Sequence, residues 1–226
     1  MSTLPQPVGF PGGLYALCDD SVRPDISLVE KARLILAGGG RVLQLRTKRT
    51  PPRDVLTVLR EILALARASA AICLVNDRVD LALIAGADGA HLGDGDLPVD
   101  EARRLLGPKA IIGRTARNLD GATAAARAGA DYVGLGPIFL TATKAVDHRP
   151  LGLEGLSAIA AASPLPIVAI SGITAENIAD IAAAGAHGAA VASGLLTADD
   201  IPERARRLNA AFERGLARRR IGSASP

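Results

Sequence analysis

Aromatic residues are nearly missing from this chain. They make up 2% of its 226 residues, with three phenylalanines, two tyrosines and no tryptophan. Proteins that bind single-stranded nucleic acid stack bases on several aromatic side chains, and the basic stretch near the C-terminus contains only Phe212, so no nucleic-acid partner is expected. Apolar residues still form 49% of the sequence. A sizeable core is therefore expected, built mainly from Ala, Leu, Ile and Val.

Cysteine is equally scarce, and long apolar runs are missing. Cys18 and Cys73 each lie inside a short apolar run, which indicates buried thiols in a reducing compartment rather than a disulfide or metal framework. No apolar run reaches the roughly 18 residues that a membrane-spanning helix needs. Residues 1–13 lack a basic region followed by an apolar one, so no secretory signal is expected. We therefore expect a cytoplasmic protein with no membrane partner.

The net charge of +3 does not by itself indicate a nucleic-acid surface. The basic surplus gathers near the C-terminus, at Arg204, Arg206, Arg207, Arg214, Arg218, Arg219 and Arg220. This clustering is typical of a solvated terminal helix and tail.

Strand-like apolar runs alternate with helical patterns along the whole chain. The runs are 14–19, 41–46, 71–77, 89–93, 110–115, 132–137, 167–171 and 188–193, and the helical patterns are 27–37, 53–70, 78–85, 99–106, 119–128, 153–162, 175–184 and 199–216. Eight strand–helix units in succession predict a closed parallel (β/α)8 TIM barrel. An open doubly wound sheet is the alternative, but no Gly-x-Gly-x-x-Gly follows the first strand.

One short unit recurs along the chain, at 85–90, 128–133 and 184–189. Each copy begins Ala-Gly-Ala and combines a helix end, a glycine turn and the start of the next strand. This repetition supports a single barrel domain over residues 14–217. We expect residues 1–13 to be an irregular segment and residues 218–226 to be a flexible tail.

Active sites of this fold lie at the C-terminal ends of the strands. The polar residues at those ends are Gln44, Arg46, Lys48, Asn76, Asp77, Asp96, Arg114, Thr115, Thr141, Thr143, Lys144, Ser171, Gly172 and Ser193. Two kinds of binding chemistry are present among them.

The first kind suits a diphosphate and a metal ion. Arg46 and Lys48 are two cations two residues apart, and Asp77 and Asp96 follow adjacent strands. Two carboxylates with substrate phosphate oxygens are a usual way of holding Mg²⁺. The alternative makes Asp77 a helix N-cap and Asp96 a turn residue.

The second kind suits a phosphate monoester. Gly172 and Thr174 follow the seventh strand, and Ala192-Ser193-Gly194 follows the eighth, where this fold often binds phosphate. Two ordinary glycine turns are the alternative. Thr141, Thr143 and Lys144 lie on a long connection after the sixth strand, which is either an oxyanion-binding lid or a solvated polar loop. Together the two ends suggest two substrates, one of which loses pyrophosphate.

Over about residues 14–196 the chain resembles the thiamine phosphate synthase family. The matching motifs are Gln44-Leu45-Arg46-Thr47-Lys48, Val75-Asn76-Asp77, residues 86–93 with Asp96, residues 131–139 with Thr141-Ala142-Thr143-Lys144, and Gly172-Ile173-Thr174. The resemblance implies that 4-amino-2-methyl-5-hydroxymethylpyrimidine diphosphate joins 4-methyl-5-(2-hydroxyethyl)thiazole phosphate. The products would be thiamine phosphate and pyrophosphate.

The resemblance also implies a role for each matching residue. Gln44, Arg46, Lys48, Asn76, Thr115 and Lys144 would bind the pyrimidine diphosphate, Asp77 and Asp96 would hold Mg²⁺, and Thr141, Thr143, Gly172, Ala192 and Ser193 would approach the thiazole phosphate. Leu45, Thr47 and Ala142 belong to the same implied substrate-binding set. Pyrophosphate would leave first, and the thiazole nitrogen would attack the resulting cation. Arg46, Lys48 and Lys144 would be catalytic by stabilising the leaving charge.

Five positions depart from the family pattern. They are Asp94 for Gln, Thr115 for Ser, Arg117 for His, Leu140 for Pro and Ser171 for Gly. None removes a charged group from the implied site.

Three other functions remain open. They are a thiazole tautomerase-like isomerase, a class I aldolase using Lys144 as a Schiff base, and a non-catalytic paralogue that binds phosphate ligands. We further expect residues 138–151 to be mobile without ligand. The sequence does not indicate which oligomeric state the protein has.

Overall fold

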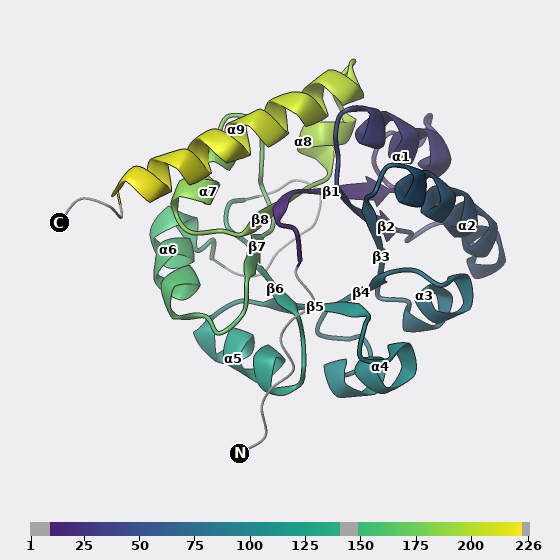
Figure 1. Cartoon of the computed structure of the whole chain (residues 1–226), viewed down its shortest axis with the longest axis horizontal. Helices are drawn as coiled ribbons and strands as arrows, with labels where there is room; N and C mark the ends of the chain where they lie inside the picture. Colours follow the sequence, from purple (N-terminus) through teal and green to yellow (C-terminus); the bar gives the residue numbers. More distant parts are fainter. Residues whose placement is uncertain (1–9, 141–148, 223–226) are drawn as a thin grey trace.

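The computed structural model describes residues 10–140 and 149–222 and has eight parallel strands in a closed barrel (Figure 1). Each strand pairs with the next one in sequence, and β8 pairs with β1. The strands are β1 (Gly13–Asp19), β2 (Val42–Arg46), β3 (Ile72–Asn76), β4 (Gly89–Leu92), β5 (Ile111–Ala116), β6 (Tyr132–Leu135), β7 (Ile167–Ala169) and β8 (Gly188–Val191). The predicted closed (β/α)8 barrel is confirmed, and the doubly wound alternative is excluded.

Helices surround this barrel on the outside (Figure 1). They are α1 (Leu28–Ala37), α2 (Pro52–Ala68), α3 (Val79–Ala85), α4 (Val99–Leu106), α5 (Leu119–Arg127), α6 (Gly152–Ala162), α7 (Ile178–Ala183), α8 (Ser193–Leu196) and α9 (Ile201–Gly222). The short helix α8 was not predicted. Helix α7 begins three residues later than expected because Asn177 closes a turn, accepting a hydrogen bond from the Thr174 N–H at 2.9 Å.

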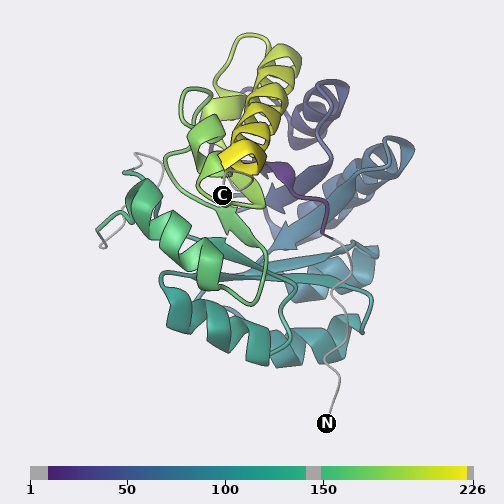
Figure 2. The ribbon, with the colours of Figure 1, turned by 60° about the vertical axis from the view of Figure 1, so that its left-hand side comes forward.

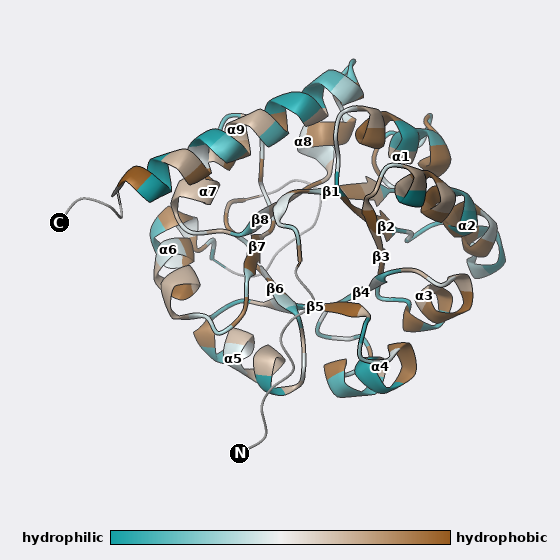
Figure 3. Cartoon of the chain, in the orientation of Figure 1, coloured by the Kyte–Doolittle hydropathy of each residue, from teal (hydrophilic) through white to brown (hydrophobic). Residues whose placement is uncertain are grey.

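Two apolar layers hold the barrel together. The larger lies between the strands and the helices, and a smaller one inside the barrel contains Phe10, Tyr15, Leu74 and Tyr132. Figure 3 shows hydrophobic residues on strands such as β2 and β3 and hydrophilic residues spread over the helices. Burying apolar surface stabilises such layers by roughly 25 cal/mol per Å².

The expected segment boundaries differ from the structure at both ends. Phe10 is 6% exposed, and its ring stacks on Tyr132 at a centroid distance of 4.5 Å, so this residue belongs to the barrel core. Helix α9 continues to Gly222, so residues 218–222 are helical rather than tail. It packs against α7, α8, α1 and β1, and Figure 2 shows it (yellow) alongside its neighbours. Residues 1–9 and 223–226 lie outside the described residues.

The recurring unit has a structural role at the N-terminal end of the strands. The Asp88 carboxylate accepts a hydrogen bond from the Cys73 N–H, and the Asp131 carboxylate accepts one from the Ile112 N–H, both at 2.7 Å. In the third copy, the His187 Nε2 bonds the Phe10 carbonyl at 2.8 Å. Each polar residue thus ties its own strand to a neighbouring segment.

In the described residues, no helix is long and apolar enough to cross a membrane.

Candidate active site

A cavity of about 680 Å³ opens at the C-terminal ends of the strands. Seven of the expected substrate-binding residues line it: Gln44, Arg46, Asn76, Thr115, Gly172, Ala192 and Ser193. They come from β2, β3, β5, the loop after β7, and the N-cap and first residue of α8. The parallel barrel therefore gathers side chains that are far apart in sequence. Leu45 and Thr47 do not line this cavity, and the Leu45 side chain is buried in the outer core.

Arg46 reaches the cavity with its charge already paired. Its Nη1 donates to Asp19 Oδ2 at 2.7 Å, and Asp19 is 1% exposed. The other oxygen of Asp19 accepts hydrogen bonds from the Ser21 N–H at 2.8 Å and the Ser21 hydroxyl at 2.6 Å. Asp19 therefore orients the guanidinium of Arg46, and the sequence analysis missed it. Its position as the last residue of the first strand was the available signal.

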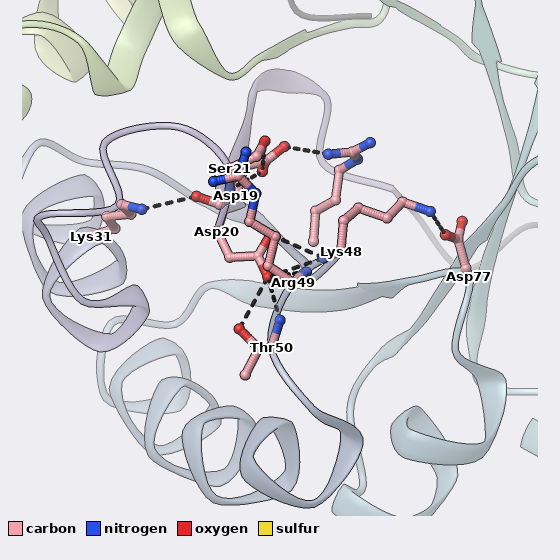
Figure 4. A network of polar contacts seen from close by, with 9 residues as sticks. Asp19, Asp20, Ser21, Lys31, Lys48, Arg49, Thr50 and Asp77 are labelled. Atoms are coloured by element: carbon pink, nitrogen blue, oxygen red, sulfur yellow. Dashed lines mark hydrogen bonds and ion pairs between the residues drawn. The ribbon is translucent and has the colours of Figure 1, made fainter.

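Lys48, Asp77 and Asp96 do not line this cavity. They form a rim beside it, because Asp77 directly follows Asn76 and Lys48 lies two residues after Arg46, and both Asn76 and Arg46 line the cavity. Lys48 Nζ donates to Asp77 Oδ2 at 2.5 Å (Figure 4). Within the described residues, helix α3 has no side-chain capping hydrogen bond, so the alternative that Asp77 is its N-cap is wrong. Asp96 does close a turn, because its Oδ2 accepts from the Gly93 N–H at 2.6 Å. Its carboxyl group also lies within hydrogen-bonding reach of the Asp77 carboxyl group.

The two carboxyl groups perturb each other. Burial raises the pKa of Asp96, and its hydrogen bond with Asp77 and the charge of Asp77 raise it further. Burial also acts to raise the pKa of Asp77, but hydrogen bonds with Lys48 and Asp96 outweigh it, so the net pKa is lowered. Two carboxylates brought together in this way favour a shared cation.

The donor set therefore suits Mg²⁺ only in part. Over residues 10–140 and 149–222, no group of three or more His, Cys, Asp or Glu side chains could hold a metal ion. Asp77 and Asp96 supply two hard oxygen donors, and Mg²⁺ commonly takes its other ligands from substrate phosphate and water. The residues fit a metal ion that arrives with a phosphate ligand.

Asp20, which the sequence analysis also missed, builds the loop that carries Lys48. Its carboxylate accepts hydrogen bonds from three backbone N–H groups, those of Lys48 at 3.0 Å, Arg49 at 2.8 Å and Thr50 at 2.9 Å (Figure 4). The Thr50 hydroxyl donates a fourth at 3.0 Å. Partial burial acts to raise the pKa of Asp20, but these donors lower it overall. The loop after β1 thus holds the loop after β2.

The opposite side of the cavity has the backbone shape expected of a phosphate site. Ser171 and Gly172 are consecutive residues with φ of 74° and 71°, and a Cβ at Gly172 would lie 2.6 Å from the Leu140 carbonyl oxygen. Asn177 Nδ2 donates to the Gly172 carbonyl at 2.9 Å, which fixes the turn. The unpredicted helix α8 begins at Ser193 on the same side. Short extra helices after the eighth strand often accompany phosphate sites in this fold.

A row of polar side chains inside the barrel forms part of the cavity wall, and every member except Tyr132 lines the cavity. Gln44, Tyr15, Tyr132, His91 and Thr115 are joined by hydrogen bonds in that order. Burial lowers the pKa of His91 to about 4, so the ring is neutral near pH 7. Tyr15, His91 and Tyr132 were not among the expected site residues, although they occupy strand positions.

Two of the departures from the family pattern are partners in the structure. Arg117 forms an ion pair with Asp94, and Arg114 approaches the same carboxylate at 3.4 Å. A second cavity, of about 490 Å³, lies beside this pair and shares Asp96 and Thr115 with the site.

Leu140, a third departure from the family pattern, is 80% exposed. Thr141, Ala142, Thr143 and Lys144 lie outside the described residues, as does most of the expected lid.

Comparison with known proteins gives a consistent result. Residues 14–195 match the family described as thiamine monophosphate synthase. A thiamine-phosphate synthase of Myxococcus xanthus is 57% identical over 206 residues, which is 91% of this chain and 94% of that protein. One of Anaeromyxobacter dehalogenans is 50% identical over 208 residues, or 92% and 91% of the two chains.

A solved structure agrees with these relatives. It is described as thiamine phosphate pyrophosphorylase from Pyrococcus furiosus and superposes with a TM-score of 0.82 at 36% identity. The match covers 90% of this chain and 96% of that chain.

Proposed function

Because the chain belongs to the thiamine monophosphate synthase family and is a transferase of that activity, we propose that its barrel-mouth cavity joins two phosphorylated substrates. They are 4-amino-2-methyl-5-hydroxymethylpyrimidine diphosphate and 4-methyl-5-(2-hydroxyethyl)thiazole phosphate, and the products are thiamine phosphate and pyrophosphate. The observation that carries this proposal is one cavity with a cationic, carboxylate-rimmed side and a glycine-turn side. Each side suits one of the phosphate groups. The buried, free thiols of Cys18 and Cys73 support a cytoplasmic location.

The diphosphate would bind at the side formed by β2, β3 and β4. Arg46, held by Asp19, and Lys48, held by the Asp20 loop, place two cations where charge develops on the departing pyrophosphate. Gln44 and Asn76 line the same side and offer amide hydrogen-bonding groups to the pyrimidine. Preorganised cations lower the barrier because they need no reorganisation as the leaving group forms. Lys144 would add a third cation.

Asp77 and Asp96 would hold the Mg²⁺ that accompanies the diphosphate. When bound, the ion would supply positive charge to the phosphate oxygens of the leaving group. Lys48 pairs with Asp77 in this structure. The diphosphate would compete for the Lys48 ammonium, which would free the Asp77 carboxylate for the metal.

The thiazole phosphate would bind at the side formed by β7 and β8. The turn at Ser171 and Gly172 and the start of α8 offer backbone N–H groups, and Thr141 and Thr143 would add hydroxyl groups. This placement would bring the thiazole nitrogen to the pyrimidine methylene carbon. Departure of pyrophosphate breaks the C–O bond, and the nitrogen lone pair then forms the new C–N bond. No side chain needs to act as a nucleophile or general base.

The other functions find no support in the comparisons, whose named relatives are thiamine-phosphate synthases. A direct experiment gives the purified protein both substrates with Mg²⁺ and detects thiamine phosphate by mass spectrometry. Borohydride trapping with a carbonyl substrate is the matched test for an aldolase, and no adduct is expected. Isomerisation of a thiazole phosphate alone, or binding without turnover, would contradict the proposal.

A further inference from the structure

Five buried or half-buried side chains form an unbroken hydrogen-bond row across the barrel interior. Gln44 Nε2 lies 2.7 Å from the Tyr15 hydroxyl, which lies 2.7 Å from the Tyr132 hydroxyl. His91 completes the row with Nδ1 2.9 Å from the Tyr132 hydroxyl and Nε2 3.0 Å from Thr115 Oγ1. The row runs through β2, β1, β6, β4 and β5. Both of its end residues line the cavity, and both belong to the proposed substrate-binding set.

Two glycines in the barrel interior make room for this row. A Cβ at Gly113 on β5 would lie 2.1 Å from Tyr132 Cζ, and a Cβ at Gly134 on β6 would lie 2.8 Å from His91 Cε1. Any larger residue at either position would displace a ring of the row. Tyr132 is also held from below by Phe10, whose ring stacks on it. The rings are therefore fixed by packing as well as by hydrogen bonds.

The orientation of the Gln44 amide, whose Nε2 faces the Tyr15 hydroxyl, sets the direction of the hydrogen bonds in this row. Gln44 donates to the Tyr15 hydroxyl, so the Tyr15 proton is available for Tyr132. Tyr132 then donates a hydrogen bond to His91 Nδ1, and the His91 Nε2–H donates one to Thr115 Oγ1. In the opposite direction, the Tyr15 hydroxyl would accept from both Gln44 and Tyr132. Its own proton would then have no acceptor among the described residues, which is costly for a buried donor.

We propose that this directed row holds His91 as its Nε2–H tautomer and thereby makes the Thr115 hydroxyl a donor to a phosphate oxygen in the cavity. The Thr115 hydroxyl has no other hydrogen-bond partner in the described part of the chain, so its proton is available to whatever fills the cavity. Tyr132 and His91 are then positioning residues that act through Thr115. The role of Thr115 toward a phosphate rests on the proposed function, whereas the direction of the row does not.

The direction can be measured without substrate. ¹⁵N-histidine NMR of the full chain near pH 7 distinguishes a protonated ring nitrogen from an unprotonated one, and a His91→Gln variant assigns the signals among the three histidines. We expect His91 Nε2 to carry the proton and Nδ1 to be unprotonated. The opposite tautomer, or a doubly protonated ring, would overturn the proposal and leave the proposed function untouched.

Two matched variants test the effect on function. Tyr132→Phe and Tyr15→Phe each remove one buried hydroxyl, but only Tyr132→Phe removes the partner of His91 Nδ1. We expect Tyr132→Phe to mix the His91 tautomers and to lower kcat/KM about two- to threefold, because only the molecules that keep the Nε2–H tautomer keep the Thr115 donor. Tyr15→Phe should keep the Nε2–H tautomer, because Tyr132 can still donate to His91. Equal tautomer populations in the two variants would contradict the directed row.

Variants at Thr115 complete the test and distinguish positioning from folding. Thr115→Ser keeps a hydroxyl and should keep kcat/KM within about threefold, whereas Thr115→Val should lose at least about tenfold. Inorganic pyrophosphate with Mg²⁺ serves as the binding probe in calorimetry, and its affinity should fall with Thr115→Val alone. Equal affinity for this probe in the two Thr115 variants would show that the hydroxyl does not donate to phosphate.

Discussion

Asp20 gives the sharpest test of how the site is positioned. It is not itself proposed to bind substrate, but its carboxylate holds the loop that carries Lys48. Its carboxylate accepts four hydrogen bonds from the Lys48–Thr50 loop, at 2.8–3.0 Å. Asp20→Asn keeps one acceptor oxygen but removes the charge. Hydrogen bonds to charged groups contribute roughly 1.5–3 kcal/mol each. Because this carboxylate is partly solvated, we expect a total loss of about 1–2 kcal/mol in the free energy of unfolding.

The loss of activity in Asp20→Asn should come from the displaced ammonium group of Lys48. A looser loop removes the preset position of the Lys48 ammonium, so Asp20→Asn should lower kcat/KM about tenfold and resemble Lys48→Met. The double variant should lose much less than the sum of the two, because both changes remove one interaction. Asp25→Asn is the matched control, since Asp25 forms an exposed ion pair with Arg23. Additive losses in kcat/KM, or wild-type activity in Asp20→Asn, would refute this reasoning.

The same variant has a definite pH dependence. The folded pKa of Asp20 is lowered, so its contribution to stability is present above the unfolded pKa of about 3.9 and is lost as pH falls through the folded pKa. Urea unfolding should therefore show the largest difference between wild type and Asp20→Asn at neutral pH. The difference should shrink below about pH 4. A difference that grows toward acid pH would have the wrong sign.

Three further predictions concern the metal, the third cation and the backbone. Asp77→Asn and Asp96→Asn should each lose most Mg²⁺-dependent turnover in a Mg²⁺ titration, and near wild-type rates would make the carboxylates structural only. In calorimetry, Lys144→Ala should weaken binding of the pyrimidine diphosphate about ten- to hundredfold and leave thiazole phosphate binding intact; the reverse result would exchange the two ends of the cavity. Ser171→Gly should raise the free energy of unfolding by about 0.5–1 kcal/mol in urea titrations, since Ser171 has φ of 74°, and an unchanged value would mean that this conformation is not strained.

The sequence was enough to predict the barrel and the edge at which the site lies. Strand–helix alternation and the glycine turns placed all eight strands, with boundary errors of one or two residues at most ends. The C-terminal ends of parallel strands meet at one edge. Residues such as Gln44, Arg46 and Thr115 could therefore be expected in one cavity from the sequence alone. The family resemblance then added roles to those positions.

The rest depended on contacts that sequence spacing does not encode. Asp20 follows the first strand as an ordinary loop residue, and its four donors come from a loop about thirty residues away. Tyr15 and Tyr132 meet across the barrel, although 117 positions separate them. Helix α8 has four residues, too few for a helical period to appear. Asp94 and Arg117 are likewise 23 residues apart, and the pairing of β4 with β5 in the barrel brings them together.

The proposed reaction couples loss of pyrophosphate to formation of thiamine phosphate in this cavity. The most direct measurement is a time course with both substrates that quantifies the two products together, with Mg²⁺ and with Mg²⁺ removed by EDTA. We expect equal amounts of thiamine phosphate and pyrophosphate at every time point, and loss of both products when Mg²⁺ is removed. Pyrophosphate released without thiamine phosphate, or neither product in the presence of Mg²⁺, would contradict it.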